Sequence, residues 1–168
     1  MSDLKVNEIK TDTIKNQAGT NAMTIDSSGR VLKPAHPAFM AGVDTTISLT
    51  TSYVELANVF TDVNINIGNH YNSTTGRFTA PVTGTYIFHY YSIYQSNSGN
   101  DLWDFLKNGS TFTGSRMHFS SGSVGSNWDN ITNTQILNLS ANDYVEIYAT
   151  DQTLHGGDWC HFCGHLLG

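Results

Sequence analysis

From residue 38 onward, apolar and polar positions alternate in short runs that are separated by turn residues, a pattern typical of an all-β protein. Residues 63–67 alternate between aliphatic side chains on one face and asparagines on the other. Residues 85–94 alternate as well, but aromatic or aliphatic side chains occupy both faces. We therefore expect a half-buried strand at the first segment and a strand with both faces at least partly covered at the second.

Further short runs of apolar residues predict the remaining strands of a β-sandwich. Asn108-Gly109, the preferred pair of a type I′ turn, predicts a tight hairpin between residues 101–107 and 111–112. Nine or ten strands in a domain of this size predict a two-sheet jelly roll. The other predicted strands are residues 39–43, 47–49, 53–60, 76–81, 131–139, 144–149 and 158–167.

Residues 1–35 have a different pattern, because single apolar residues are separated by polar ones and no aromatic residue precedes Phe39. Residues 23–25 and 31–32 predict two short strands about a glycine-containing turn. This segment cannot bury its apolar side chains by itself, so we expect an extended, β-rich arm (1–35) that attaches to another chain, followed by the jelly-roll head (36–168). The arm residues expected to anchor it are Leu4, Val6, Ile9 and Ile14.

Composition narrows the class of protein. Only 13% of the residues are charged, whereas Thr, Ser, Asn and Gly together supply 67 residues, which disfavours a helical bundle. The net charge of -6 argues against nucleic acid or an anionic membrane as a partner. Residues 1–17 lack the apolar run of a secretory signal, and no segment has the length of a membrane span. These features predict synthesis in a reducing cytoplasm and no membrane insertion.

Several motifs in the head resemble the globular domain of the complement C1q and tumour necrosis factor superfamily. They are Pro37-Ala38-Phe39, Tyr71, residues 76–81 (Gly-Arg-Phe-Thr-Ala-Pro), residues 84–88 (Gly-Thr-Tyr-Ile-Phe), residues 106–109, 137–139 and 142–145, and residues 162–167 at the end of the chain. The resemblance covers residues 36–168 in the family's order. It implies a C1q/TNF-like jelly-roll sandwich of about ten strands that assembles as a homotrimer.

The arm resembles the leaders of bacteriophage tail-fibre and other virion structural proteins, on residues 4–14 and 25–31. Together, the two resemblances imply a trimeric tail fibre, spike or capsid decoration on the virion surface. Its arm would bind other virion proteins, and its head would bind a host-surface glycan or protein. Two alternatives are a bacterial C1q-like adhesin or lectin-type module and a virion cement protein without a ligand.

Enzyme signatures are missing from the sequence. It contains no Gly-x-Ser-x-Gly elbow, no His-Glu-x-x-His helix and no nucleotide-binding glycine loop. Asp101 and Asp104 have an odd spacing that points them to opposite faces of a strand, and isolated polar residues of this kind are usually solvated. The sequence therefore predicts a protein that is not an enzyme.

Residues 155–165 concentrate histidine and cysteine near the end of the chain. On a strand, His161, Cys163 and His165 share one face and Cys160 lies on the other, so neither a one-chain zinc site nor a disulfide between the cysteines fits. Near the three-fold axis that the resemblance implies, three copies of these residues could bind a structural metal. Otherwise the cysteines pack as small apolar groups and the histidines form hydrogen bonds; no other cofactor is expected.

The candidate ligand-binding residues are Trp128, Asp129 and Asn130, which follow a Ser/Gly-rich segment. An exposed indole stacks on sugar rings, while carboxylates and amides bind hydroxyl groups. Trp103 beside Asp101 and Trp159 beside Asp158 fit the same chemistry, but both lie in predicted strands, so we expect them to pack in the core.

Overall fold

The computed structural model describes residues 11–49, 53–96, 100–120, 127–150 and 152–168. The chain forms two compact units that divide between His36 and Pro37. Three of the proposed anchoring residues, Leu4, Val6 and Ile9, lie outside the described residues. The fourth, Ile14, lies in the first unit and is exposed.

The first unit is a three-stranded antiparallel sheet of β1 (Thr13–Lys15), β2 (Asn21–Ile25) and β3 (Val31–Leu32). The turn between β2 and β3 is fixed by Asp26, whose carboxylate accepts hydrogen bonds from the backbone N–H groups of Ser28 and Arg30 and pairs with the Arg30 guanidinium at 2.7 Å. This sheet leaves large apolar side chains in solvent. They are Ile14, Ile25, Val31 and Leu32.

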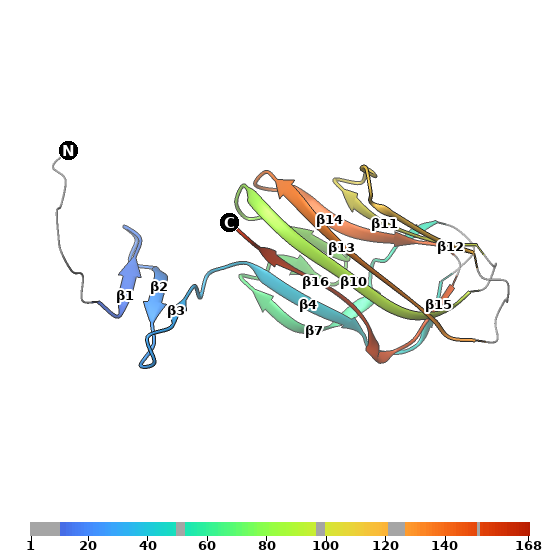
Figure 1. Ribbon diagram of the computed structural model, residues 1–168, viewed down its shortest axis with the longest axis horizontal. Coiled ribbons are helices and arrows are strands. Elements are labelled where there is room, and N and C mark those ends of the chain that lie inside the picture. Colours follow the sequence, from blue (N-terminus) through green and yellow to red (C-terminus); the bar gives the residue numbers. More distant parts are fainter. Residues whose placement is uncertain (1–10, 50–52, 97–99, 121–126, 151) are drawn as a thin grey trace. The chain divides into compact units, whose positions relative to one another are not determined.

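The second unit is a sandwich of two sheets (Figure 1). The first sheet contains β4 (Ala38–Val43), β5 (Ile47–Ser48), β7 (Phe60–Ile67), β10 (Gly84–Ser96), β13 (Asp129–Leu139), β15 (Gln152–Leu154) and β16 (Gly157–Leu166). Its order is β5-β15-β10-β16-β4-β7, and β13 pairs with the other edge of β10.

The second sheet contains β6 (Val54–Glu55), β8 (Tyr71–Asn72), β9 (Arg77–Thr79), β11 (Asn100–Lys107), β12 (Arg116–Ser120) and β14 (Tyr144–Ala149). Its order is β12-β11-β14-β9-β8, with β6 paired to β14. The described residues contain strands and turns but no helix, so the expected all-β jelly roll is confirmed.

An aromatic core joins the two sheets. Phe39 of β4 stacks on Tyr71 and Phe78 of the second sheet, with ring centroids 4.7 and 5.0 Å apart. Phe162 of β16 meets Phe39 edge-on at 4.8 Å, and all four side chains are buried. Because such ring pairs add to the free energy gained by burial, this cluster stabilises the contact between the layers. It leaves the opposite face of the first sheet free for other contacts.

The predicted strand at residues 53–60 is wrong in its extent. Only Val54–Glu55 forms a strand, and a turn separates it from Phe60, where β7 begins. Asn58 adopts a left-handed backbone with φ of 56°, which interrupts the extended chain. Gly76 accommodates the turn, because a Cβ there would lie 2.6 Å from the carbonyl oxygen of Leu56.

The predicted hairpin at Asn108-Gly109 has the expected turn but a different second strand. Asn108 and Gly109 both have positive φ, and Lys107 and Ser110 exchange backbone hydrogen bonds across the turn. Residues 111–112 do not form the returning strand; β12 begins only at Arg116. The intervening loop is held by local contacts such as that from the Phe112 N–H to the Ser115 hydroxyl.

Candidate functional site

The outward face of the first sheet carries most of the side chains that the core does not use. Along β10, Tyr86, Phe88 and Tyr90 are buried against the core, whereas the residues between them point outward and are half-buried. Along β16, Cys160 and Phe162 are buried in the same way. The outward residues of these two strands are Ile87, His89, Tyr91 and Ile93 on β10 and Trp159, His161, Cys163 and His165 on β16.

Strand register brings apolar residues together on this face. Ile87 lies opposite His165 on one side and Ile136 of β13 on the other, and His165 lies opposite Ala38 of β4, which in turn pairs with Ile67 of β7. Ile136 is 62% exposed, and Ile65, Ile67 and Met40 are also exposed. Exposed aliphatic side chains gathered on one face of a sheet in this way are typical of a protein–protein contact.

The alternating segment at residues 63–67 contributes to this surface. Ile65 and Ile67 remain exposed on β7, opposite Met40 and Ala38, although the sequence suggests a buried aliphatic face. Val63 is also exposed, but a bulge places it opposite the inward-facing Ala41. β7 is an edge strand of the first sheet that pairs with β4. The apolar surface of these residues is therefore available for a contact with another chain.

Histidine side chains lie near the middle of the outward face. The rings of His89 and His161 have centroids 5.5 Å apart, and Tyr91 lies at the same distance from His161. Burial, and secondarily the neighbouring His89, lower the pKa of His161. The His89 ring also forms a 2.9 Å hydrogen bond with the Thr134 hydroxyl. The neutral imidazole is therefore the favoured form of His161 on this face.

The candidate metal ligands do not form a site within one chain. His161, Cys163 and His165 follow one another on the same face of β16, and the described residues contain no group of three metal-binding side chains. Burial raises the pKa of the Cys163 thiol, which disfavours the thiolate that binds metals. A metal shared by three chains stays a prediction.

The two cysteines are free and lie on opposite faces of β16. Cys160 is buried on the core side, where its sulfur lies 3.2 Å from both the Ser92 hydroxyl and the Ile93 carbonyl oxygen. Burial raises the pKa of this thiol, so it stays protonated as a small interior group.

The three tryptophans have different environments. Trp103 is fully buried and meets Tyr94 at 4.5 Å, as expected of a core residue. The expectation that Trp159 packs in the core is wrong, because 51% of its surface is exposed. In the pairing of β16 with β4, Gly157 and His161 lie opposite the adjacent residues Val43 and Gly42. Trp159 lies in the resulting bulge, on the outward side.

Trp128, His155 and Trp159 form an aromatic cluster at the start of β13 and β16. The His155 ring centroid lies 4.5 Å from that of Trp128 and 5.5 Å from that of Trp159. Sequence reasoning favoured Trp128 as the stacking residue, preferred core packing for Trp159 and assigned no such role to His155. Because 26 or more positions separate Trp128 from the other two rings, only the sheet topology could reveal the cluster.

Asp129 and Asn130 point to opposite faces of the sheet and do not form one site with Trp128. Asp129 lies opposite the inward-facing Tyr94 and is half-buried, whereas Asn130 lies opposite Ile93 and is exposed on the outward face. Strand alternation thus separates the carboxylate from the indole of Trp128.

A small hollow of about 100 Å³ opens beside the bulge of β16. Its polar side chains are Asp62 and Asn64 of β7 and Asp158 and His161 of β16. Gly157 also lines the hollow, and a Cβ at Gly157 would lie 4.0 Å from Cδ1 of Trp159. The hollow therefore adjoins the aromatic cluster.

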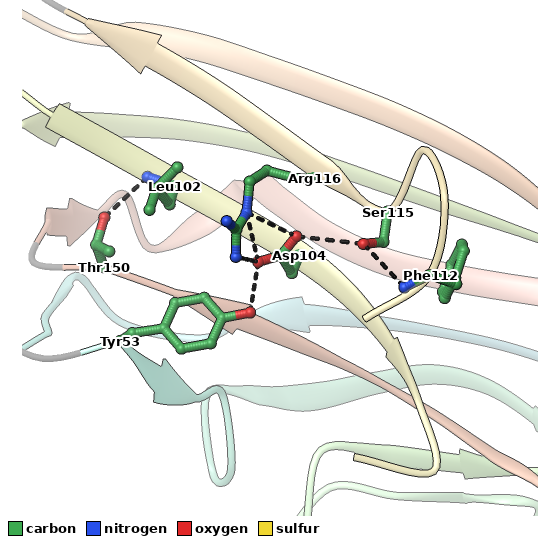
Figure 2. A network of polar contacts seen from close by, with 7 residues as sticks. All are labelled: Tyr53, Leu102, Asp104, Phe112, Ser115, Arg116 and Thr150. Atoms are coloured by element: carbon green, nitrogen blue, oxygen red, sulfur yellow. Dashed lines mark hydrogen bonds and ion pairs between the residues drawn. The ribbon is translucent and has the colours of Figure 1, made fainter. Parts of the chain in front are cut away.

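Asp104 belongs to a structural network in the second sheet rather than to a catalytic pair (Figure 2). Its buried carboxylate accepts hydrogen bonds from the Arg116 guanidinium at 2.8 Å, the Ser115 hydroxyl at 3.3 Å and the Tyr53 hydroxyl. The expectation that Asp101 and Asp104 are solvated is wrong, because both side chains are buried. The contacts of Asp104 fix β11, β12 and the segment before β6 to one another.

A jelly roll with an apolar outward face on one sheet defines a class of trimer-forming recognition domains. The C1q domain family model matches residues 38–167, so the chain belongs to the C1q domain family. Domains of the C1q/TNF class typically assemble as trimers, bind ligands and lack enzymatic activity.

Among the curated proteins similar to this chain are two mammalian ones. The mouse and human proteins named complement C1q tumor necrosis factor-related protein 3 are each 32% identical over 133 residues, which is 77% of this chain. The chain spans about half the length of these relatives.

The solved structures share the fold at low sequence identity. The globular domain of zebrafish complement 1qA is 18% identical with a TM-score of 0.58, and the alignment covers 79% of this chain and 98% of that one. Eiger TNF from S. frugiperda is 14% identical with a TM-score of 0.61 and coverage of 80% and 94%. Murine APRIL is 11% identical with a TM-score of 0.57 and coverage of 79% and 99%.

These relatives correct one expectation from the sequence. The predicted location on a virion, with synthesis in a host cytoplasm, is wrong, because the curated relatives are mammalian C1q tumor necrosis factor-related proteins. The C1q/TNF resemblance of the head is confirmed, whereas the phage context of the arm receives no support. In the part of the chain that the structure describes, no helix has the length and apolarity needed to cross a membrane.

Proposed function

We propose that this chain is a non-enzymatic recognition protein that acts as a homotrimer of C1q-type heads. The three heads pack through the outward face of β7, β4, β16, β10 and β13, and the assembly presents identical ligand sites. The observation that carries this proposal is a row of outward residues in register across these five strands, in which Ile136 and Ile67 at the two ends are exposed. The residues of the row are Ile136, Ile87, His165, Ala38 and Ile67.

Burial of apolar surface favours a contact between copies of the chain at this face. Burying apolar surface contributes about 25 cal/mol per Å², so a surface formed by large aliphatic side chains supplies a strong driving force for association. Charged side chains that would oppose close packing are rare, because the outward positions of β10 and β13 are apolar, aromatic, hydroxyl-bearing, amide or histidine residues. A second copy of the chain carries the same apolar side chains and can therefore cover this surface.

Three linked heads also explain how a weak site could serve as an attachment device. When one head binds, the other two are held near the same surface at high effective concentration, so the assembly binds far more tightly than a single head. The exposed apolar residues of the first unit, including Ile14 and Ile25, support attachment of the arm to another chain. Leu4, Val6 and Ile9 remain predicted anchoring residues.

Replacing Ile136 with Asp tests the packing face. Ile136 is 62% exposed in the single chain, so the substitution should leave the fold intact. We expect the wild-type protein to have about three times the chain mass of 18.4 kDa by light scattering, and the I136D protein to have the mass of one chain. The control is Val82→Asp, an exposed turn residue that should leave the trimer unchanged. A trimer that survives I136D would contradict this packing face.

A further inference from the structure

We propose that Trp128, His155 and Trp159 form a carbohydrate-binding platform that takes a neutral pyranose, with Asp158 and the adjoining hollow binding its hydroxyl groups. This inference rests on the proposed function, because it supplies the ligand site that the trimer would present.

The exposure of the two indoles is the first argument. Trp128 and Trp159 are 43% and 51% exposed although indoles usually bury most of their surface, and each packs against the same imidazole. The rings are in contact with one another, so they form a surface rather than a cage around a void. A surface of this kind stacks on the apolar C–H face of a sugar ring.

The polar groups beside the platform are suited to sugar hydroxyls. The hollow next to Trp159 offers carboxylate acceptors from Asp62 and Asp158 and a side-chain amide from Asn64. Sugar sites combine apolar stacking with a few convergent polar groups that fix orientation. The hollow is large enough for a hydroxymethyl or hydroxyl substituent but not for a whole pyranose, so the ring itself lies over the aromatic cluster.

Charge selects among sugars. Two carboxylates line the hollow, and the whole chain has a net charge of -6. An anionic sugar placed there would be repelled, whereas a neutral one can donate its hydroxyl protons to the carboxylates. The site should therefore discriminate against sialylated and sulfated glycans.

Local backbone contacts hold the platform in place before any ligand binds. The His155 N–H donates to the Ile93 carbonyl oxygen at 3.0 Å. Gly156 packs so closely that a Cβ there would lie 2.2 Å from the Thr46 nitrogen, and Gly157 has a φ of 78°. Because the loop is already ordered by these contacts, little conformational entropy is lost on binding.

β4 begins at one end of the first sheet, and the platform lies at the other end. Ala38 pairs with His165 near the end of β16, whereas Trp159 lies near the start of β16. The exposed aliphatic residues Ile136 and Ile67 are in register with Ala38 and His165, far along the strands from Trp159. The trimer contact and the platform are thus separable by mutation.

The test measures binding of the purified full-length protein to neutral hexose oligosaccharides and to their sialylated and sulfated forms. Binding is detected on an immobilised glycan panel and confirmed for the best neutral oligosaccharide by quenching of tryptophan fluorescence. We expect neutral glycans to bind and anionic forms to bind more weakly. Trp128→Ala and Trp159→Ala should each weaken binding about tenfold while light scattering still reports the wild-type oligomer. The matched control is Phe119→Ala on β12, whose aromatic side chain is 43% exposed in the second sheet.

Each outcome separates the platform from the proposed function. If the wild-type trimer binds no neutral glycan, or if both tryptophan variants bind as well as wild type, the platform is wrong and the trimeric assembly stands. If either tryptophan variant dissociates the trimer, the indoles belong to the contact between chains and the platform is wrong. If the wild-type protein is a monomer that still loses glycan binding on Trp128→Ala, the platform stands and the trimer fails.

Discussion

Individual polar side chains in this protein differ in role according to their burial. Asp104 is fully buried and bonded to Arg116, Ser115 and Tyr53, so it is part of the framework of the second sheet (Figure 2). Asp158, of the same residue type, is exposed beside a hollow and free to meet a ligand. Burial of a charged group is stable only when partners compensate for its lost hydration, which is the case for Asp104.

Removing the Asp104 carboxylate should destabilise the fold. Asp104→Ala leaves the Arg116 guanidinium and the Tyr53 and Ser115 hydroxyls without their shared acceptor, so we expect the free energy of unfolding to fall by about 3 kcal/mol. Chemical denaturation monitored by tryptophan fluorescence measures this loss. Asp44→Ala, at an exposed position, is the control and should change stability by less than about 0.5 kcal/mol. Equal effects of the two substitutions would contradict a structural role for Asp104.

His161 should make stability depend on pH. Burial and His89 lower its pKa below the usual 6.5, so the folded state takes up this proton less readily than the unfolded state. The stability that neutral His161 contributes is fully present above the pKa of this residue in the unfolded state. It is lost as the pH falls through the lower pKa that the residue has in the folded state. The groups that face it are His89 and Tyr91 on β10 and, around the hollow, Asp62 and Asp158.

The measurement compares urea midpoints at about pH 7.5 and about pH 5.5 at one chain concentration. We expect the wild-type midpoint to fall at the lower pH and His161→Gln to reduce this fall. His118→Gln, at an exposed site on β12, should leave it unchanged. The explanation fails if both variants retain the full wild-type pH dependence.

Whole strands differ in how far their sequences define them. For residues 85–94 and 160–165, strand alternation predicted which side chains share a face, and β10 and β16 have these groupings. It did not predict which face is inward, because apolar side chains occupy both faces. The interruption of the strand at Asn58 could not be predicted, because it depends on a left-handed backbone and on the close approach of Gly76 to Leu56. The bulge that exposes Trp159 arises from register against β4, a long-range property.

Close packing of β16 on β10 yields a prediction at the same scale. A Cβ at Gly164 would lie 2.5 Å from Cδ1 of Phe88 and 2.8 Å from the Ile87 carbonyl oxygen. Gly164→Ala should therefore lower the free energy of unfolding by about 1–3 kcal/mol. Gly42→Ala in β4 is the matched control, since its nearest contact would be 3.4 Å and its cost should be smaller. Denaturant unfolding measures the free energy of unfolding of both variants. Equal losses in the two variants would contradict close packing at Gly164.

At the scale of the whole molecule, the motifs of residues 36–168 were enough to predict the jelly roll and its C1q/TNF class. The virion location could not be obtained in this way, because short apolar spacings in an arm do not identify the particle or tissue that carries it. The low charge noted in the sequence gains a physical meaning on the outward face, where aliphatic, aromatic, Thr, Asn and His side chains leave few obstacles to a second chain.

The central claim is that three copies pack through the outward face of the first sheet. An experimental structure of the purified full-length protein in its assembled state tests it most directly. We expect a three-fold axis beside β10, β13 and β16, with Ile136 and Ile67 buried between chains. A monomer, or an oligomer whose chains meet through the second sheet and leave Ile136 in solvent, would contradict the account.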